Sequence, residues 1–114
     1  MSIESLTADL RAFAIERDWE QFHTPKNLAM ALAGEAGELL AEFQWLTTEQ
    51  SEKLDEKQRE AVAEEMADVL IYLCRLSDVL GIDLEQAAAN KIAANAERYS
   101  IEVSHGNAEK VHKE

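Results

Sequence analysis

Residues 61–80 read AVAEEMADVLIYLCRLSDVL, a stretch without Gly or Pro that is followed directly by Gly81. Its large apolar residues recur three or four positions apart, which is the spacing of one face of an α-helix. They are Val62, Met66, Val69, Leu73, Leu76 and Leu80. Gly is common just past the C-terminus of a helix because it adopts the left-handed conformation without strain. The stretch therefore predicts one long helix that ends at Leu80.

Three further helices are predicted from apolar residues at the same spacing and from capping signals. They span residues 3–17, 25–44 and 83–99. Thr24-Pro25 offers an N-cap followed by proline at the first helical position. Thr47 with Gln50 matches a capping box and predicts a short helical turn before a charged, exposed segment over residues 49–60. The chain is expected to be all-α, with four to five helices.

Composition supports this fold class and one domain. The chain has 114 residues, one Pro, four Gly and 46% hydrophobic residues, which favours helices and a folded core. We expect a domain over residues 1–100 and a tail over residues 101–114, where the apolar pattern is lost. Several apolar stripes in so small a chain also predict a homo-oligomer, a dimer or a tetramer.

The net charge of −12 argues against partners that are themselves polyanionic. Nucleic-acid polymers and anionic membrane surfaces are bound through basic patches. No apolar run approaches the length of a membrane span, and the N-terminal residues lack the pattern of a signal peptide. The single cysteine, Cys74, is interpreted as a buried structural thiol. The expected location is the cytoplasm.

Two pairs of acids stand out against this pattern. Glu35 and Glu38 are three positions apart, as are Glu65 and Asp68, so each pair shares one side of its predicted helix. At about 100° per residue, that side is the apolar one in both helices. Two such helices packed antiparallel would bring four carboxylates together, which could not all stay ionised without a cation. Oxygen ligands suit Mg²⁺ or Mn²⁺; the alternative is an ordinary solvated acidic face.

Two more groups of residues could complete a site for a phosphorylated ligand. Lys91, Asn95 and Arg98 share one face of the last helix and could grip phosphate oxygens, or could form a surface ladder with nearby acids. Aromatic and imidazole side chains near helix ends could stack on a base, or could simply pack in the core. This second group consists of Trp19, His23, Trp45 and Tyr72, with Phe22 beside them.

The motif Gly34-Glu35-Ala36-Gly37-Glu38-Leu39, followed by Glu65-Met66-Ala67-Asp68-Val69, resembles a known signature. It is the ExxE…ExxD pattern of the all-α nucleoside triphosphate pyrophosphohydrolases, the MazG-like superfamily. Flanking segments such as residues 17–23, 43–45 and 91–99 extend the resemblance over residues 15–100, above all to the dCTP pyrophosphatase branch. A MazG-like bundle that assembles into dimers or tetramers, with sites built between subunits, is what the resemblance implies for the fold.

For function, the resemblance implies Mg²⁺-dependent cleavage of a nucleoside triphosphate between the α- and β-phosphates. The products are a monophosphate and pyrophosphate, and the expected substrates are dCTP or related pyrimidine deoxynucleotides, removed to clean the nucleotide pool. Glu35, Glu38, Glu65 and Asp68 would hold the metal, with Glu38 and Glu35 as catalytic residues. Trp19, His23, Trp45 and Tyr72 would line the base and sugar pocket, and Lys91, Asn95 and Arg98 would bind phosphate. A non-catalytic metal- or nucleotide-binding helical module is the alternative.

Overall fold

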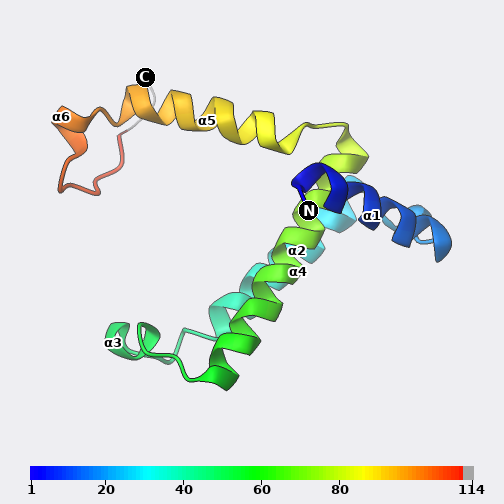
Figure 1. The fold of residues 1–114 in the computed structure, drawn as a ribbon, viewed down its shortest axis with the longest axis horizontal. Coiled ribbons are helices and arrows are strands. Elements are labelled where there is room, and N and C mark those ends of the chain that lie inside the picture. Colours follow the sequence, from blue (N-terminus) through cyan, green and yellow to red (C-terminus); the bar gives the residue numbers. More distant parts are fainter. Residues whose placement is uncertain (112–114) are drawn as a thin grey trace. The chain divides into compact units, whose positions relative to one another are not determined.

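The computed structural model describes residues 1–111, and all of its regular structure is helical (Figure 1). Clustering of contacts divides the chain into two compact units: the first is Met1–Ile82 and the second begins at Asp83. The elements in order are α1 (Ile3–Glu16), the 3₁₀ turn η1 (Glu20–Phe22), α2 (Pro25–Ala41), α3 (Thr48–Ser51), α4 (Glu56–Leu80), α5 (Leu84–Arg98) and α6 (Ile101–Ser104). The predicted all-α class is confirmed, while the domain boundary at residue 100 stays a prediction.

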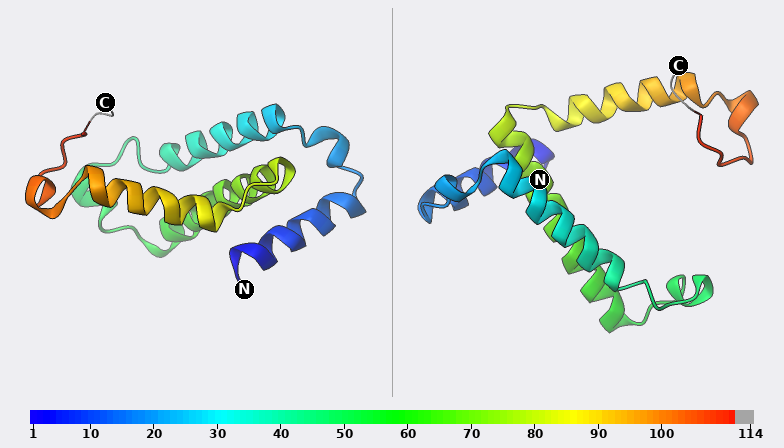
Figure 2. Two further views of the ribbon diagram at one scale, coloured as in Figure 1. Left: turned by 90° about the horizontal axis from the view of Figure 1, so that it is seen from above. Right: turned by 180° about the vertical axis from the view of Figure 1, so that it is seen from behind.

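The first unit is organised around α4, its longest helix. Helix α2 lies alongside α4 and runs in the opposite direction, as Figures 1 and 2 both show, and α1 packs near the C-terminal end of α4. The fully buried apolar residues of this unit come from all three helices: Ala14 of α1, Leu28 of α2 and Cys74 of α4. The antiparallel pair predicted for the acid-bearing helices is therefore present.

Capping residues set most helix ends where the sequence places them. Thr24 accepts from the Asn27 N–H at the start of α2, Thr47 and Gln50 form the predicted box at α3, and Gly81 ends α4 with a φ of 68°. One end differs from its prediction. Helix α2 stops at Ala41, three residues before Gln44, because the Phe43 and Gln44 N–H groups both turn back to the Leu40 carbonyl.

In the second unit, α5 begins after Asp83, whose side chain accepts from the Gln86 N–H. The segment after it belongs to the predicted tail. Residues 101–104 form the single turn α6, and the Val111 N–H donates to the Tyr99 hydroxyl at 3.1 Å. The end of the predicted tail, residues 112–114, lies outside the described residues.

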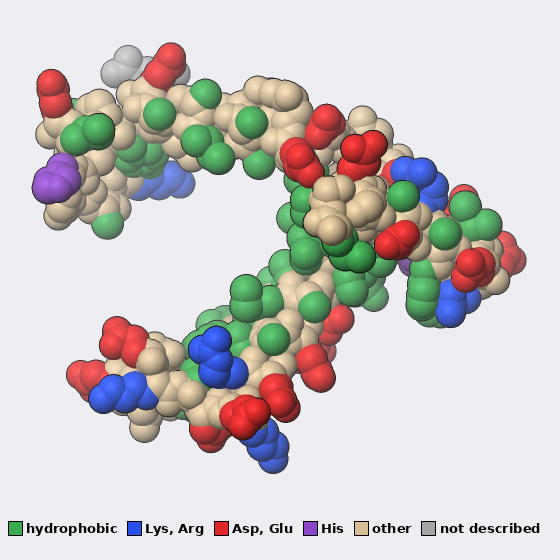
Figure 3. Space-filling view, viewed as in Figure 1, with side chains coloured by type: hydrophobic (Ala, Val, Ile, Leu, Met, Phe, Trp, Pro, Cys, Tyr) green, Lys and Arg blue, Asp and Glu red, His purple; other side chains and the backbone are tan. Residues whose placement is uncertain are grey.

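Large apolar side chains remain exposed on the first unit, and Figure 3 shows hydrophobic atoms along the α2–α4 pair. On these two helices they are Met30, Leu40, Met66, Leu70, Ile71, Val79 and Leu80. Two antiparallel helices can bury only one stripe each against one another, so the remaining stripes are left without a partner in a single chain. Within residues 1–111, no helix is both long enough and apolar enough to span a membrane.

A candidate metal centre between helices α2 and α4

Three of the four predicted acids come together where α2 packs against α4. One carboxylate oxygen from each of Glu35, Glu38 and Glu65 lies within 4.8 Å of the other two. Glu35 and Glu38 are one turn apart on α2, and Glu65 reaches them from the neighbouring helix α4. Asp68 follows Glu65 by one turn and is half-buried, but it is not part of this triplet.

Two of these acids each have one carboxylate oxygen that is shielded from water and receives no hydrogen bond. Oε2 of Glu35 and Oε2 of Glu65 are buried, and neither has a hydrogen-bond partner. Burial raises the pKa of both carboxyl groups above the usual glutamate value, and the Glu38 and Asp68 carboxylates raise them further. Neighbouring carboxylate oxygens that are buried without a hydrogen-bond donor are unfavourable unless a positively charged group binds them.

The triplet fits a small divalent cation. Oxygens on opposite sides of a Mg²⁺ ion lie about 4.2 Å apart, twice the usual metal–oxygen distance of about 2.1 Å. Small rotations of the three side chains would therefore bring their oxygens onto one ion. Carboxylates without imidazole or thiolate ligands are a donor set that Mg²⁺ or Mn²⁺ accepts. Glu38 is the exposed member, so this side of the cluster is open to water and to a ligand.

The predicted aromatic pocket is divided in two. Trp19 lies edge-on to Phe13 at 5.7 Å and to His23 at 6.3 Å between ring centroids. Trp45 is 86% exposed and follows the far end of α2. The 17 residues of α2 span about 25 Å, so one chain does not bring Trp45 to Trp19. Tyr72 is half-buried on α4.

An unusual turn holds Trp19 against Phe13. Asp18 has a φ of 53°, the left-handed conformation that L-residues seldom adopt,. The Trp19 N–H donates to the Ala14 carbonyl and the Asp18 N–H to the Ile15 carbonyl, which is the Schellman pattern of helix ends,. This turn ends α1 and directs the chain into η1 and His23.

His23 is the end of a polar network that sequence analysis missed. The buried Arg75 donates from Nε to His23 Nδ1 at 3.0 Å and from Nη1 to Asp78 Oδ2 at 2.8 Å. Asp78 also accepts from Arg11 Nη2 at 2.6 Å. Burial lowers the pKa of His23, and the Arg75 guanidinium lowers it further, against an opposing effect of Glu20. The available signal was the pair Arg75 and Asp78, opposite charges three apart in an apolar run.

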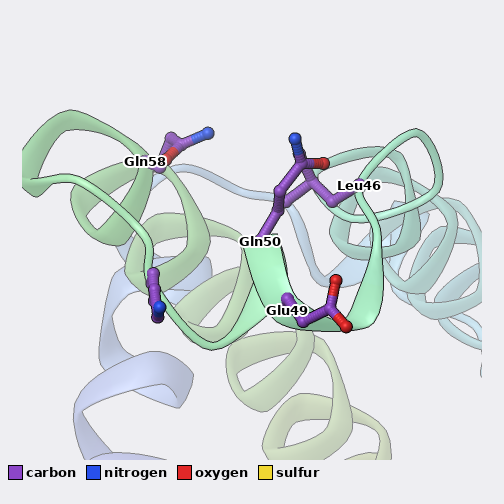
Figure 4. A pocket seen from close by; sticks show the side chains of 5 residues that line it. Leu46, Glu49, Gln50 and Gln58 are labelled. Carbon is purple, nitrogen blue, oxygen red and sulfur yellow. The ribbon is translucent and has the colours of Figure 1, made fainter.

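Two surface hollows accompany these features. One, of about 440 Å³, adjoins the network and is lined by Arg11, Ile15, Glu20, His23, Arg75, Asp78 and Val79. The other, of about 350 Å³, lies beside α3 (Figure 4) and is lined by Leu46, Glu49, Gln50, Lys53 and Gln58. The second contains none of the predicted site residues, whereas the first includes His23.

The predicted phosphate-binding residues belong to the second unit. Lys91 is exposed on α5, and Asn95 and Arg98 are half-buried, at spacings of four and three along the helix. They share one face, as the sequence indicates. Their role toward phosphate stays a prediction.

An all-helical protein with a carboxylate cluster between two antiparallel helices is the class that this fold and site define. The chain belongs to the MazG-like family, whose model matches residues 31–113. It is 47% identical over 98 residues to dCTP pyrophosphatase 1 of Mus musculus, covering 84% of this chain and 58% of that protein. The Homo sapiens protein of the same name is 43% identical over 100 residues, covering 86% of this chain and 59% of its own length.

The chain thus spans less than two thirds of these curated relatives. A solved structure of a pyrophosphatase from Archaeoglobus fulgidus is similar over more of its length. It matches with a TM-score of 0.80 and 41% identity, covering 85% of this chain and 91% of that one. The fold is therefore shared with that pyrophosphatase over most of both chains.

Proposed function

We propose that the protein is a nucleoside triphosphate pyrophosphohydrolase that uses a divalent metal ion, with dCTP or a related pyrimidine deoxynucleotide as substrate. The observation that carries the proposal is the triplet Glu35, Glu38 and Glu65, with its buried oxygens that lack donors. The relatives named dCTP pyrophosphatase 1 and the similar pyrophosphatase structure supply the reaction class. The MazG-like signature supplies the bond to be cleaved, that between the α- and β-phosphates.

In this proposal, Glu35, Glu38, Glu65 and Asp68 hold the metal. Bound Mg²⁺ would neutralise phosphate charge and lower the pKa of bound water. Glu38, the exposed acid, orients the attacking water and takes its proton. The water oxygen bonds to the α-phosphorus, the bond from that phosphorus to the bridging oxygen breaks, and pyrophosphate leaves. Lys91 and Arg98 offset the charge that develops on the leaving group.

The proposed active form is a homo-oligomer. The α2–α4 pair leaves Met30, Met66 and Leu70 exposed, and a second pair packed on them would complete a four-helix bundle. An oligomer also accounts for the divided pocket, because Trp45 of one chain can approach Trp19 and His23 only of another. Light scattering after size-exclusion chromatography tests this assembly, and a monomer at micromolar concentration contradicts it.

The reaction is tested with a panel of deoxynucleoside triphosphates in the presence and absence of Mg²⁺. We expect equal amounts of monophosphate and pyrophosphate, no orthophosphate, and the highest kcat/KM with dCTP. Hydrolysis in H₂¹⁸O then identifies the phosphorus that is attacked. Label in the monophosphate supports attack at the α-phosphorus, and label in pyrophosphate contradicts it. Absence of turnover with every nucleotide would favour a binding module.

A further inference from the structure

The contact between Arg75 and His23 fixes more than the position of the imidazole ring. A guanidinium has only donors and is not deprotonated in proteins. Since Arg75 Nε donates to Nδ1 of His23 at 3.0 Å, Nδ1 must be the unprotonated nitrogen. A neutral ring then carries its proton on Nε2. The geometry thus specifies one of the two neutral tautomers.

Arg75 is itself held by its surroundings. The residue is 6% exposed, and its second donor binds Asp78, which Arg11 clamps from α1 through both Nε and Nη2. The planar fork of arginine allows one side chain to bind His23 and Asp78 together, which a lysine ammonium does less well. The imidazole is also bounded by the edge of Trp19. These contacts leave the ring little freedom to rotate or to change tautomer.

The second nitrogen of the His23 ring, Nε2, has no protein hydrogen-bond partner in the described part of the chain. Within residues 1–111, the bond from Arg75 is the one hydrogen bond of the His23 ring. His23 is half-buried and lines the hollow of about 440 Å³ beside the network. A purely structural tie between α4 and the start of α2 would not need an imidazole whose second nitrogen is left free.

We propose that Arg75 is a positioning residue that holds His23 in the Nε2–H tautomer, so that the ring offers a single N–H donor to the pyrimidine of the nucleotide. This proposal rests on the proposed function for its ligand. Cytosine, uracil and thymine all present an acceptor at O2, but N3 is an acceptor in cytosine and carries a hydrogen in uracil and thymine. A donor fixed opposite N3 therefore favours cytosine, because an N–H facing an N–H leaves both unpaired.

The tautomer is tested without substrate by ¹⁵N NMR of protein labelled at histidine. Ring nitrogen shifts distinguish a protonated from an unprotonated nitrogen, and His23→Gln assigns the signals. We expect wild-type His23 to show an unprotonated Nδ1 and a protonated Nε2 at pH 7. Arg75→Met should give a mixture of tautomers. A wild-type ring that carries its proton on Nδ1, or that averages between tautomers, would overturn the proposal.

Arg11→Met is the matched control, because it removes a guanidinium from Asp78 and leaves the Arg75–His23 bond in place. It should leave the His23 tautomer unchanged; a mixture like that of Arg75→Met would contradict the role assigned to Arg75. Circular dichroism and thermal unfolding check that the variants fold. If Arg75→Met does not fold, Arg75→Lys replaces it, and the wild-type spectrum alone still decides the tautomer.

Steady-state kinetics test whether the His23 donor distinguishes cytosine from uracil. In Arg75→Met we expect KM for dCTP to rise about tenfold, with kcat changed less than twofold and a smaller ratio of kcat/KM between dCTP and dUTP. An unchanged ratio in a variant whose tautomer is lost would overturn the role in base recognition. If wild-type protein hydrolyses no nucleotide, the proposed function fails, while the NMR result still stands for or against the Arg75–His23 contact.

Discussion

Helix α4 carries two charged clusters that are built in opposite ways. Near its middle, Glu65 joins Glu35 and Glu38 in a cluster of one sign, with two buried oxygens that lack donors. Ten residues later, about 15 Å along the helix, the Asp78 carboxylate lies between the guanidiniums of Arg75 and Arg11. Arg75 also donates to the neutral ring of His23. The second cluster pairs its carboxylate with two guanidiniums, whereas two carboxylate oxygens of the first receive no hydrogen bond.

The difference separates what a cluster does for the fold from what it offers a ligand. A network of alternating charges and hydrogen bonds stabilises the protein that contains it and needs no metal ion. Carboxylates that lie together without hydrogen-bond donors lower the stability of the protein. The rest of the fold must compensate for that loss. The acid triplet is therefore the candidate for chemistry, and the arginine network is the candidate for positioning.

The largest expected effect comes from breaking the acid triplet. Glu38→Gln keeps the size of the side chain and removes its charge, so it should lower kcat by at least about a hundredfold, beyond the loss typical of outer-shell changes. Steady-state pyrophosphate release measures this. Glu64→Gln is the matched control, since Glu64 adjoins Glu65 on α4 but lies outside the triplet. Equal losses in the two variants, or full activity in Glu38→Gln, would remove Glu38 from the site.

Breaking the arginine network should act on stability. The hydrogen-bonded Arg11 guanidinium lowers the pKa of Asp78, partly against burial, and Arg75 lowers it further. Asp78→Asn leaves two guanidiniums facing a neutral amide. We expect a loss of about 2 kcal/mol in the free energy of unfolding, between the values for exposed and buried ion pairs. Urea unfolding measures it, with the exposed α1 residue Asp9 changed to Asn as control. A loss no larger than that of the control contradicts the expectation.

Metal binding should distinguish the clusters directly. At ten times its dissociation constant, Mg²⁺ should stabilise wild-type protein by about 1.4 kcal/mol, which raises Tm by several degrees. Glu65→Gln should abolish this rise, whereas Asp78→Asn should keep it although its starting Tm is lower. Differential scanning calorimetry at fixed protein concentration gives both values. Retention of the Mg²⁺ effect in Glu65→Gln would place the cation elsewhere.

Local signals predicted much of the fold. Helix starts at Thr24, Thr47 and Asp83 follow from side chains that cap their own backbone three residues on, and such contacts are written in adjacent residues. The inward placement of Glu35 and Glu65 also follows from helical periodicity alone. The end of α2 at Ala41 did not follow from the sequence, because the backbone turns at Phe43 and no Gly or Pro marks the turn.

Contacts between residues far apart in the chain could not be predicted from the sequence. His23 and Arg75 are 52 positions apart, and their contact depends on the register between η1 and α4, which no local pattern encodes. The aromatic residues differ, because their separation follows from a local feature. Trp19 and Trp45 lie near opposite ends of α2, and the length of that helix keeps them apart in one chain,. The charged pair Arg75 and Asp78 was visible, yet its partners were not.

The smallest expected effect concerns pH. Burial, then Arg75, lower the pKa of His23 in the folded protein, and Glu20 opposes them. As pH falls below about 6.5, the unfolded chain takes up a proton at this residue that the folded protein still excludes, so the contribution of His23 to the free energy of unfolding decreases. His23→Gln removes that proton uptake. Between pH 7 and 5.5, the variant should therefore lose about 2 °C less in Tm than the wild type.

The exposed His105, changed to Gln, provides the control for that measurement. This variant removes an imidazole that has no hydrogen bond to a guanidinium within the described residues, so it separates the effect of the Arg75 contact from that of losing any histidine. A His23→Gln variant that loses more Tm than the wild type over this range would reverse the sign and indicate a protonated His23 in the folded protein. That result would be incompatible with an Arg75 donor at Nδ1, and it would leave the acid triplet as the one cluster of α4 with an assigned chemical role.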